Sequence, residues 1–151
     1  MAGRCDAMTI LRIVIAFVVW SQVAAVWAEE QPDFIRIWTI EKPLCPGKCG
    51  KFTFDYVTRF VGKQIDVGRD WFTNDMFESC LHAVHYDDIT HQDAAQFLSP
   101  YKVKPASLGI RQKKVWAGRV FCNNTAIATL IYVNDKKMIM VFEHGVYVPL
   151  K

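Results

Sequence analysis

The C-terminal third of the chain, VWAGRVFCNNTAIATLIYVNDKKMIMVFEHGVYVPL at residues 115–150, decides the fold. It holds four apolar runs rich in β-branched side chains, at 115–122, 126–133, 137–142 and 146–150. Short polar turns separate them: Asn123-Asn124, Asn134-Asp135 and Glu143-His144-Gly145. Asparagine, aspartate and glycine are the residues that tight hairpin turns favour. Strands of this length with two- or three-residue turns predict an antiparallel β-meander.

Shorter strands are predicted upstream of the meander. Residues 34–40, FIRIWTI, are β-branched and aromatic, and a second short strand is predicted at 63–67. Residues 51–59 alternate like a strand but also fit a short helix, so both interpretations stay open. Residues 79–86 predict a strand that places four side chains on one side: Cys80, His82, Val84 and Tyr86.

One helix is predicted, at residues 90–98. Thr90 can cap it, Asp93 follows three residues later where an acid favours a helix N-terminus, and Pro100 ends it. Residues 101–109 then form a connecting loop. The fold class that we predict is a β-rich α+β domain: a twisted antiparallel sheet or small barrel, with the C-terminal β-meander and one short helix.

The first 28 residues have the order of a secretory signal peptide. Basic Arg4 and Arg12 precede the apolar run 13–20, and small residues then lead to Val26 and Ala28 at the cleavage positions. The run is shorter than the roughly 20 apolar residues that a membrane span needs. We therefore predict a signal peptide at 1–28, and a single exported domain at 29–151 that is periplasmic or secreted and has no membrane span.

Removing the signal peptide leaves a weakly charged domain. The mature chain keeps 16 basic and 14 acidic residues, a net charge of +2. Its basic residues are scattered apart from two lysine pairs, at 113–114 and 136–137. Nucleic-acid-binding domains carry a denser basic patch, so we expect no nucleic-acid partner.

Four cysteines remain after export, and an even number in an oxidising compartment predicts two disulfides. Pro46-Gly47 suits the centre of a tight turn that brings Cys45 and Cys49 together. We therefore favour Cys45–Cys49 with Cys80–Cys122. The alternative is that both turn cysteines bond to the body of the domain. The three-residue spacer and the oxidising compartment disfavour redox catalysis and zinc binding, so we expect neither a metal nor a cofactor.

Catalytic motifs are scarce. The sequence contains no GxSxG, HExxH, P-loop or dinucleotide fingerprint. The only candidate catalytic cluster is His82, His85, Asp87 and Asp88, and a hydrolase using it is one alternative function. On a strand, His82 and His85 would point to opposite faces, which disfavours a shared metal ion. We expect a protein that is not an enzyme.

Aromatic residues suggest a second alternative. They make up 13% of the chain, and most should pack in the core. Trp71, Trp116 and Tyr132 could instead line an apolar pocket if the sheet closes on itself. The protein would then be a lipocalin-like carrier of a small apolar ligand.

The short cysteine loop Cys45-Pro46-Gly47-Lys48-Cys49 carries a family resemblance. It is similar to the disulfide-closed loop that Ivy-type lysozyme inhibitors insert into the enzyme's active site. In that family the cysteines are separated by four residues that include a histidine, whereas this spacer has three residues and no histidine. The chain's general architecture also resembles small exported β-domains of Gram-negative bacteria, namely periplasmic lysozyme inhibitors and lipocalin-like proteins.

This resemblance covers one loop and a general architecture. It implies an exported, non-enzymatic binding protein that inhibits a cell-wall hydrolase, with another exported or cell-envelope protein as its partner. Lys48, presented between Cys45 and Cys49 by Pro46 and Gly47, is the contact that we expect. A preformed loop loses less conformational entropy on binding than a flexible one, so the stapled turn suits this role.

Overall fold

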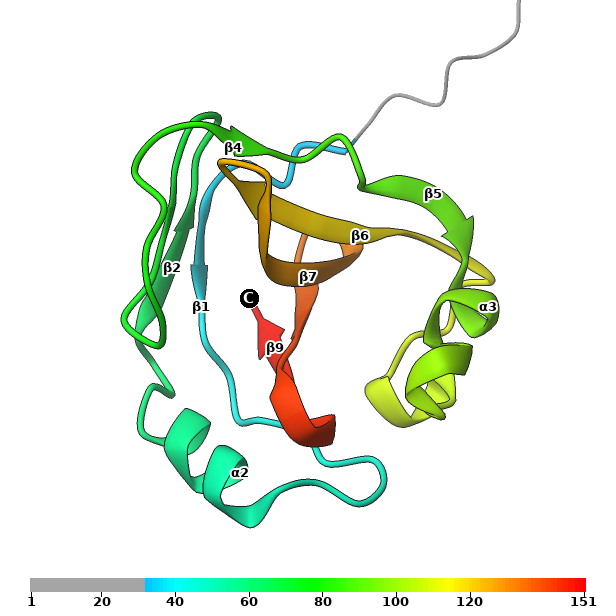
Figure 1. Cartoon of the computed structure of the whole chain (residues 1–151). Helices are drawn as coiled ribbons and strands as arrows, with labels where there is room; N and C mark the ends of the chain where they lie inside the picture. Colours follow the sequence, from blue (N-terminus) through cyan, green and yellow to red (C-terminus); the bar gives the residue numbers. More distant parts are fainter. Residues whose placement is uncertain (1–31) are drawn as a thin grey trace, which may run out of the picture. The chain divides into compact units, whose positions relative to one another are not determined.

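The structure is a computed structural model that describes residues 32–151, and the predicted signal peptide at 1–28 lies outside the described residues. Residues Gln31–Lys151 form one compact unit. Figure 1 shows two antiparallel sheets. The smaller sheet has the order β1-β2-β3, with bounds Ile37–Thr39, Gln64–Val67 and Phe72–Thr73. The larger sheet contains β4 (Val84–His85), β5 (Thr90–Asp93), β6 (Lys114–Cys122), β7 (Thr125–Asn134), β8 (Lys137–Val141) and β9 (Tyr147–Leu150).

The predicted β-meander is confirmed as β6-β7-β8-β9. Asn123 and Asn124 both adopt positive φ, at 47° and 69°, as a tight turn between β6 and β7 requires. The register shifts between Val120 and Phe121 of β6, where Ile127 of β7 is the extra, unpaired residue of a β-bulge. The connection from β8 to β9 is a single 3₁₀ turn, η3 (Glu143–Gly145).

The two sheets are connected along one side by backbone hydrogen bonds. The Thr39 N–H donates to the Lys151 carbonyl at 2.7 Å, and the Lys151 N–H donates to the Thr39 carbonyl at 3.0 Å. Ile40 and Leu150 form an isolated antiparallel β-bridge beside them. Hydrogen bonding therefore continues from β1 to β9.

The opposite side is not closed by a strand ladder, so the small barrel that the sequence allowed is not found. There β3 pairs with the following segment only through the Phe72–Cys80 bridge. Cys80 is then bonded to Cys122 at the end of β6. A disulfide thus joins the two sheet edges where backbone pairing stops.

The prediction of a strand at 79–86 is mostly wrong. The break in this segment explains why the two sheets do not pair on this side. Only Val84–His85 form a strand, and Ala83 adopts a positive φ of 59°. A left-handed residue breaks the alternation of an extended chain. Cys80 and Val84 are consequently buried, whereas His82 between them is exposed.

Residues 32–151 contain two short α-helices, whereas one was predicted there. The ambiguous segment 51–59 is a helix, α2 (Lys51–Thr58), which buries Thr53 and Val57 one turn apart. The predicted helix at 90–98 is correct only in its second half. Its first half is β5, and α3 spans Ala94–Leu98 with Asp93 as the N-cap, accepting from the Gln96 N–H at 2.9 Å.

The segment predicted as a connecting loop, 101–109, contains ordered 3₁₀ turns. η1 spans Ser99–Tyr101 and η2 spans Pro105–Leu108. They end at Lys102 and Gly109, which both adopt the left-handed conformation. Leu108 of η2 is buried, so this segment adds to the core.

The hydrophobic core has two parts, one on each face of the larger sheet. In β8, Met138 and Met140 belong to the cluster shared with the smaller sheet, while Ile139 belongs to the cluster under α3 and η2. In β7, Leu130 and Ile131 divide in the same way. Both faces of the central strands are therefore apolar and buried, as in sheets covered on two sides.

Candidate functional site

Both predicted disulfides are confirmed. Cys45–Cys49 has a Cα–Cα distance of 5.7 Å, and Cys80–Cys122 has one of 5.9 Å. The alternative pairing, in which the two turn cysteines bond to the body of the domain, is excluded. Two disulfides indicate an oxidising, extracellular compartment.

The Cys45–Cys49 loop is held at both ends by backbone hydrogen bonds. On one side Leu44 pairs with Tyr147 through two bonds, of 2.7 and 3.0 Å. On the other side the Gly50 N–H donates to the His144 carbonyl at 3.0 Å. Figure 1 shows the chain passing beside the turn that precedes β9 and then leading into α2. Covalent and hydrogen-bonded restraints together fix the backbone of the loop.

Gly145 allows the η3 turn to approach this loop closely. Its φ is +77°, and a Cβ there would lie 2.8 Å from the Lys48 carbonyl oxygen. That distance is shorter than real Cβ contacts show. His144 precedes it with a φ of 52°. The Glu143-His144-Gly145 turn therefore supports the loop from beside it.

The exposed side chains around this loop form what we call the loop surface: Lys48, Lys51, Phe52 and His144. Lys48, in the loop, is exposed. Phe52 is 83% exposed, and the His144 side chain is 69% exposed. Residues 42–54 contain three lysines and no acidic residue. The loop surface therefore carries two lysines and an exposed aromatic ring, and at its margin the Glu143 carboxylate lies 3.9 Å from His144 Nε2.

Sequence reasoning missed three members of this surface: Lys51, Phe52 and His144. His144 reaches it only through the hydrogen bond to Gly50, which joins segments far apart in the chain. Phe52 lies in the segment 51–59, for which the sequence allowed either a strand or a helix. It faces solvent because helix α2 buries Thr53 and Val57 instead. A helical periodicity with Thr53 and Val57 on one face was the signal that could have placed it.

The three aromatic residues predicted to line a carrier pocket occupy different environments. Trp116 and Tyr132 are direct neighbours on β6 and β7. The Trp116 ring stacks on His91 at 5.2 Å. Tyr132 is 7% exposed, and its hydroxyl donates to the Asp135 carboxylate. Burial, and then the Asp135 hydrogen bond, raise the pKa of Tyr132 to about 12.

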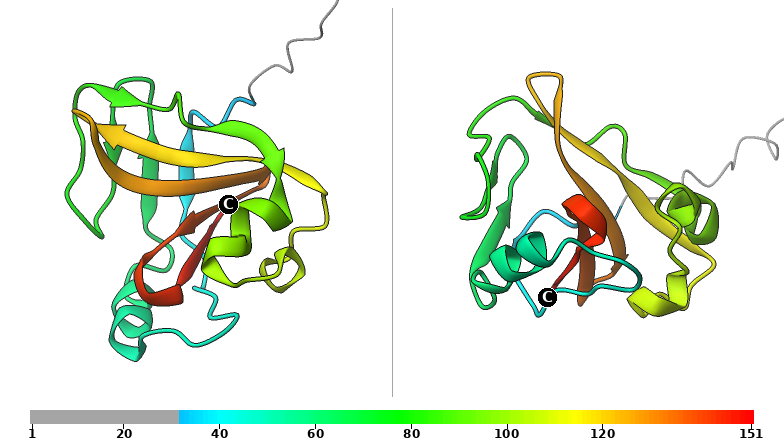
Figure 2. Two further views of the ribbon diagram at one scale, coloured as in Figure 1. Left: turned by 45° about the vertical axis from the view of Figure 1, so that its right-hand side comes forward. Right: turned by 60° about the horizontal axis from the view of Figure 1, so that its bottom comes forward.

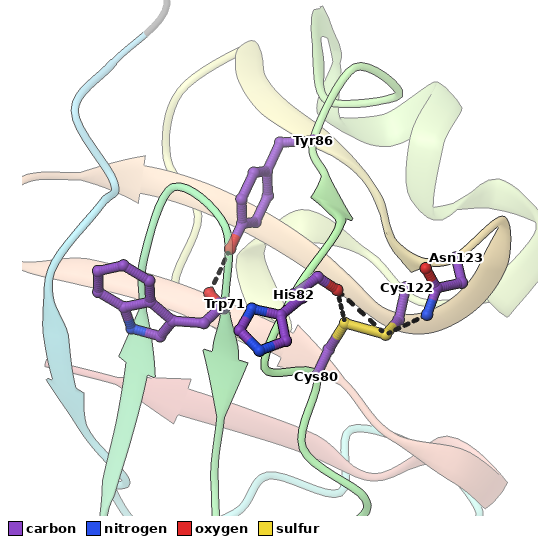
Figure 3. Close-up of a disulfide and its surroundings, with 6 residues drawn as sticks. All are labelled: Trp71, Cys80, His82, Tyr86, Cys122 and Asn123. Atoms are coloured by element: carbon purple, nitrogen blue, oxygen red, sulfur yellow. Dashed lines mark hydrogen bonds between the residues drawn. A yellow bond between two sulfur atoms is a disulfide. The ribbon is translucent and has the colours of Figure 1, made fainter.

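Trp71 belongs to the other sheet and is 42% exposed. Its ring covers Gly68, where a Cβ would lie 2.0 Å from it. The Tyr86 hydroxyl donates to the carbonyls of Gly68, at 2.8 Å, and Trp71, at 3.2 Å, and Figure 3 shows the second bond. Burial, and then the Asp66 charge, raise the pKa of Tyr86 above its ordinary value. Trp71 thus fixes the turn before β3.

The predicted catalytic cluster is only partly assembled. His85, Asp87 and Asp88 line one surface hollow of about 600 Å³. Arg119 binds Asp88 through its Nε at 3.1 Å and its backbone N–H at 3.0 Å, and this side-chain hydrogen bond lowers the pKa of Asp88. Among residues 32–151, no hydrogen bond joins His85 to either carboxylate. His85 therefore lacks the orienting carboxylate hydrogen bond that catalytic dyads and triads share.

His82 lies apart from that hollow, beside the second disulfide. Its carbonyl oxygen contacts Cys80 Sγ at 3.0 Å and Cys122 Sγ at 3.9 Å, as Figure 3 shows. The Asn123 side-chain amide also lies 3.9 Å from Cys122 Sγ. Asp88 is therefore paired with Arg119, and the His82 carbonyl oxygen contacts the Cys80–Cys122 disulfide.

In the described part, residues 32–151, no group of three or more His, Cys, Asp or Glu side chains could hold a metal ion, and no helix is long and apolar enough to cross a membrane. No protein-family model matches the sequence, and neither a curated protein nor a solved structure matches it.

Proposed function

We propose that this is an exported, non-enzymatic binding protein that contacts another exported or cell-envelope protein through its loop surface. The observation that carries the proposal is the fixation of the Cys45–Cys49 loop, by its disulfide and by hydrogen bonds at Leu44 and Gly50. Lys48 lies exposed between these restraints. The periplasm and the extracellular medium are the compartments that we propose.

The rigidity of the loop favours tight binding. Association normally costs conformational entropy as loops and side chains become ordered, and a preformed loop avoids part of this cost. Phe52 adds an aromatic side chain that is 83% exposed, and buried aromatic anchors contribute much of the free energy of binding at protein interfaces. Lys48 and Lys51 add positive charge beside it.

The charge of the loop surface suggests the class of partner, a cell-wall hydrolase that the protein inhibits. Most glycosidases cleave their substrate with a pair of carboxyl groups in a cleft. A fixed loop that exposes an ammonium group complements the charge of such a cleft. The resemblance of the loop to that of lysozyme inhibitors agrees with this proposal, although Lys48 stands in the spacer where that family has a histidine.

The test combines enzyme inhibition with capture. The mature protein is titrated into a lysozyme that digests peptidoglycan, and it is also immobilised to capture partners from periplasmic extract. Lys48→Glu is compared with Lys113→Glu, which makes the same charge change at an exposed residue away from the loop. We expect Lys48→Glu to weaken inhibition and capture about 30-fold, since losing a buried interfacial charge costs about 2 kcal/mol.

The outcomes separate the parts of the proposal. If capture depends on Lys48 but the lysozyme is not inhibited, the protein-binding role stands and the hydrolase class is wrong. If Lys48→Glu and Lys113→Glu behave alike in both assays, the loop surface is not the interface.

One observation favours a second candidate, a hydrolase, because His85 shares a hollow with Asp87 and Asp88. A panel of ester, phosphate and glycoside substrates tests it. Turnover that His85→Ala abolishes, and that Lys48→Glu leaves unchanged, would favour this candidate over the binding role.

A further inference from the structure

Strand β7 has a free edge near its start. On one side β7 pairs with β6 along nearly its whole length, from Thr125 opposite Cys122 to Tyr132 opposite Trp116. On the other side β8 pairs with it only from Thr129 onward, opposite Val141. Figure 2 shows the β6–β7 hairpin extending beyond β8. Within residues 32–151, positions 125–128 of β7 therefore have a strand neighbour on one side only.

A groove runs beside this free edge. It consists of two adjoining hollows, of about 240 and 270 Å³, which share Glu78 and Ile127 as lining residues. The segment 77–80 lines them opposite β7. One hollow ends at Phe142 and Glu143, and the other ends at the Cys80–Cys122 disulfide. The groove is thus the open seam at which the sheets fail to close.

The lining of the groove is apolar in the middle and acidic at its rim. Phe77, Ile127 and Phe142 supply half-buried apolar surface, and the rings of Phe77 and Phe142 are 6.3 Å apart. The charged side chains lining the two hollows are Glu78 and Glu143, and both are acidic and exposed. An occupant that carries positive charge on either side of an apolar side chain complements this lining.

We propose that the groove binds an extended segment of a partner protein by strand addition to residues 125–128 of β7. Backbone hydrogen bonds to the free edge would supply affinity, as in other strand-addition complexes. An apolar side chain of the segment contacts Phe77 and Phe142, and flanking lysine or arginine side chains face Glu78 and Glu143. Glu143 of the groove lies 3.9 Å from His144 of the loop surface, so the two surfaces adjoin, but Lys48 does not line the groove and the inference does not depend on the proposed inhibitory role.

Two other occupants fit the groove less well. Anionic lipid or nucleic acid would face the carboxylates of Glu78 and Glu143 across the groove. A second copy paired edge to edge through β7 would bring the acidic rims of the two copies together, and like charges so placed are repulsive.

The test uses fluorescence anisotropy with three labelled heptapeptides. The first alternates lysine with valine and phenylalanine, the second replaces its lysines with glutamates, and the third is the lysine peptide with methylated backbone nitrogens. Removing the backbone N–H groups abolishes strand pairing but keeps the side chains. We expect saturable binding of the lysine peptide, and affinities at least about tenfold lower for the other two.

Variants of the full mature chain locate the site. Glu78→Lys should weaken binding of the lysine peptide about tenfold and strengthen binding of the glutamate peptide. Asp70→Lys makes the same charge change in the turn before β3 and should leave both affinities within about twofold. Lys48→Glu should have no effect, which separates this site from the loop surface.

Several results would overturn the proposal. They are equal binding of the methylated peptide, an equal effect of Glu78→Lys and Asp70→Lys, or no saturable binding of the lysine peptide. A different outcome would assign the edge to a second copy of the chain. The protein would then bind no peptide but would dimerise with increasing concentration in sedimentation, and Thr125→Pro would abolish this dimerisation.

Discussion

Removing the Cys80–Cys122 disulfide should destabilise the protein more than removing the Cys45–Cys49 disulfide. This bond joins residues 42 apart in the chain, whereas Cys45–Cys49 joins residues 4 apart. The loss of loop-closure entropy in the unfolded chain grows with this separation, to about 4 kcal/mol for the long loop and about 2 kcal/mol for the short one. Cys80 is also buried, and its bond spans the seam that no strand ladder closes.

The measurement is urea unfolding of three proteins: the mature chain, Cys80→Ala/Cys122→Ala and Cys45→Ala/Cys49→Ala. With an m-value of about 2 kcal/mol/M, the first double variant should lower the midpoint by about 2 M and the second by about 1 M. Using alanine pairs avoids free thiols, and the short-loop variant controls for loss of a disulfide as such. If both variants lose equal stability, or the short-loop variant loses more, the role assigned to the long cross-link at the seam is wrong.

Three further predictions concern single residues. Gly145→Ala should lower the free energy of unfolding by about 1–2 kcal/mol and weaken partner binding, because the φ of Gly145 is +77° and a Cβ there would contact the Lys48 carbonyl oxygen. Urea unfolding and the inhibition assay measure these two effects. The raised pKa of Tyr132 means that its stabilisation is complete below pH 10 and is lost as the pH rises toward about 12; melting temperatures from pH 8 to 12 should fall less steeply for Tyr132→Phe. Asp93→Ala removes the α3 cap and should cost about 1 kcal/mol, whereas a loss below 0.3 kcal/mol would contradict the capping role.

The parts of the fold that were predictable depend on local signals. In the meander, the alternation of apolar residues and the Asn123-Asn124 turn are both encoded by neighbouring residues, so β6 to β9 were predicted nearly to their bounds. The disulfide pairing was predictable because Pro46-Gly47 by itself favours closure of a short loop.

The errors arose where distant partners decide the structure. Residues 90–93 have a helix-like start signal, but His91 and Gln92 pair with Trp116 and Val115 of β6. The ladder outweighed local propensity, and Asp93 capped a shorter helix instead. Residues 79–86 lost their strand because Ala83 adopts a positive φ, which no alternation of side chains signals.

The exposed loop residue Lys48 could be singled out from the sequence, whereas the exposed residues that surround it in the structure could not. Lys48 is placed by its own five-residue loop, so the sequence sufficed to identify it. His144 lies beside the loop only because the chain returns there after the whole meander has formed. Contacts of this kind depend on the tertiary fold and leave no pattern in the neighbouring sequence.

The burial of both faces of the larger sheet has a consequence for how its strands find their alignment. A slip of one residue in β7 or β8 exchanges the two faces, and in most sheets this would expose apolar side chains to water. Here both faces are apolar, because Met138 and Met140 pack on one side and Ile139 on the other. Burial alone therefore discriminates weakly against a slipped pairing. The Asn123-Asn124 turn and the bulge at Ile127 are the local features that distinguish the correct alignment of β7 on β6, so these turn and bulge residues, more than burial, should select the native hairpin from its misaligned competitors.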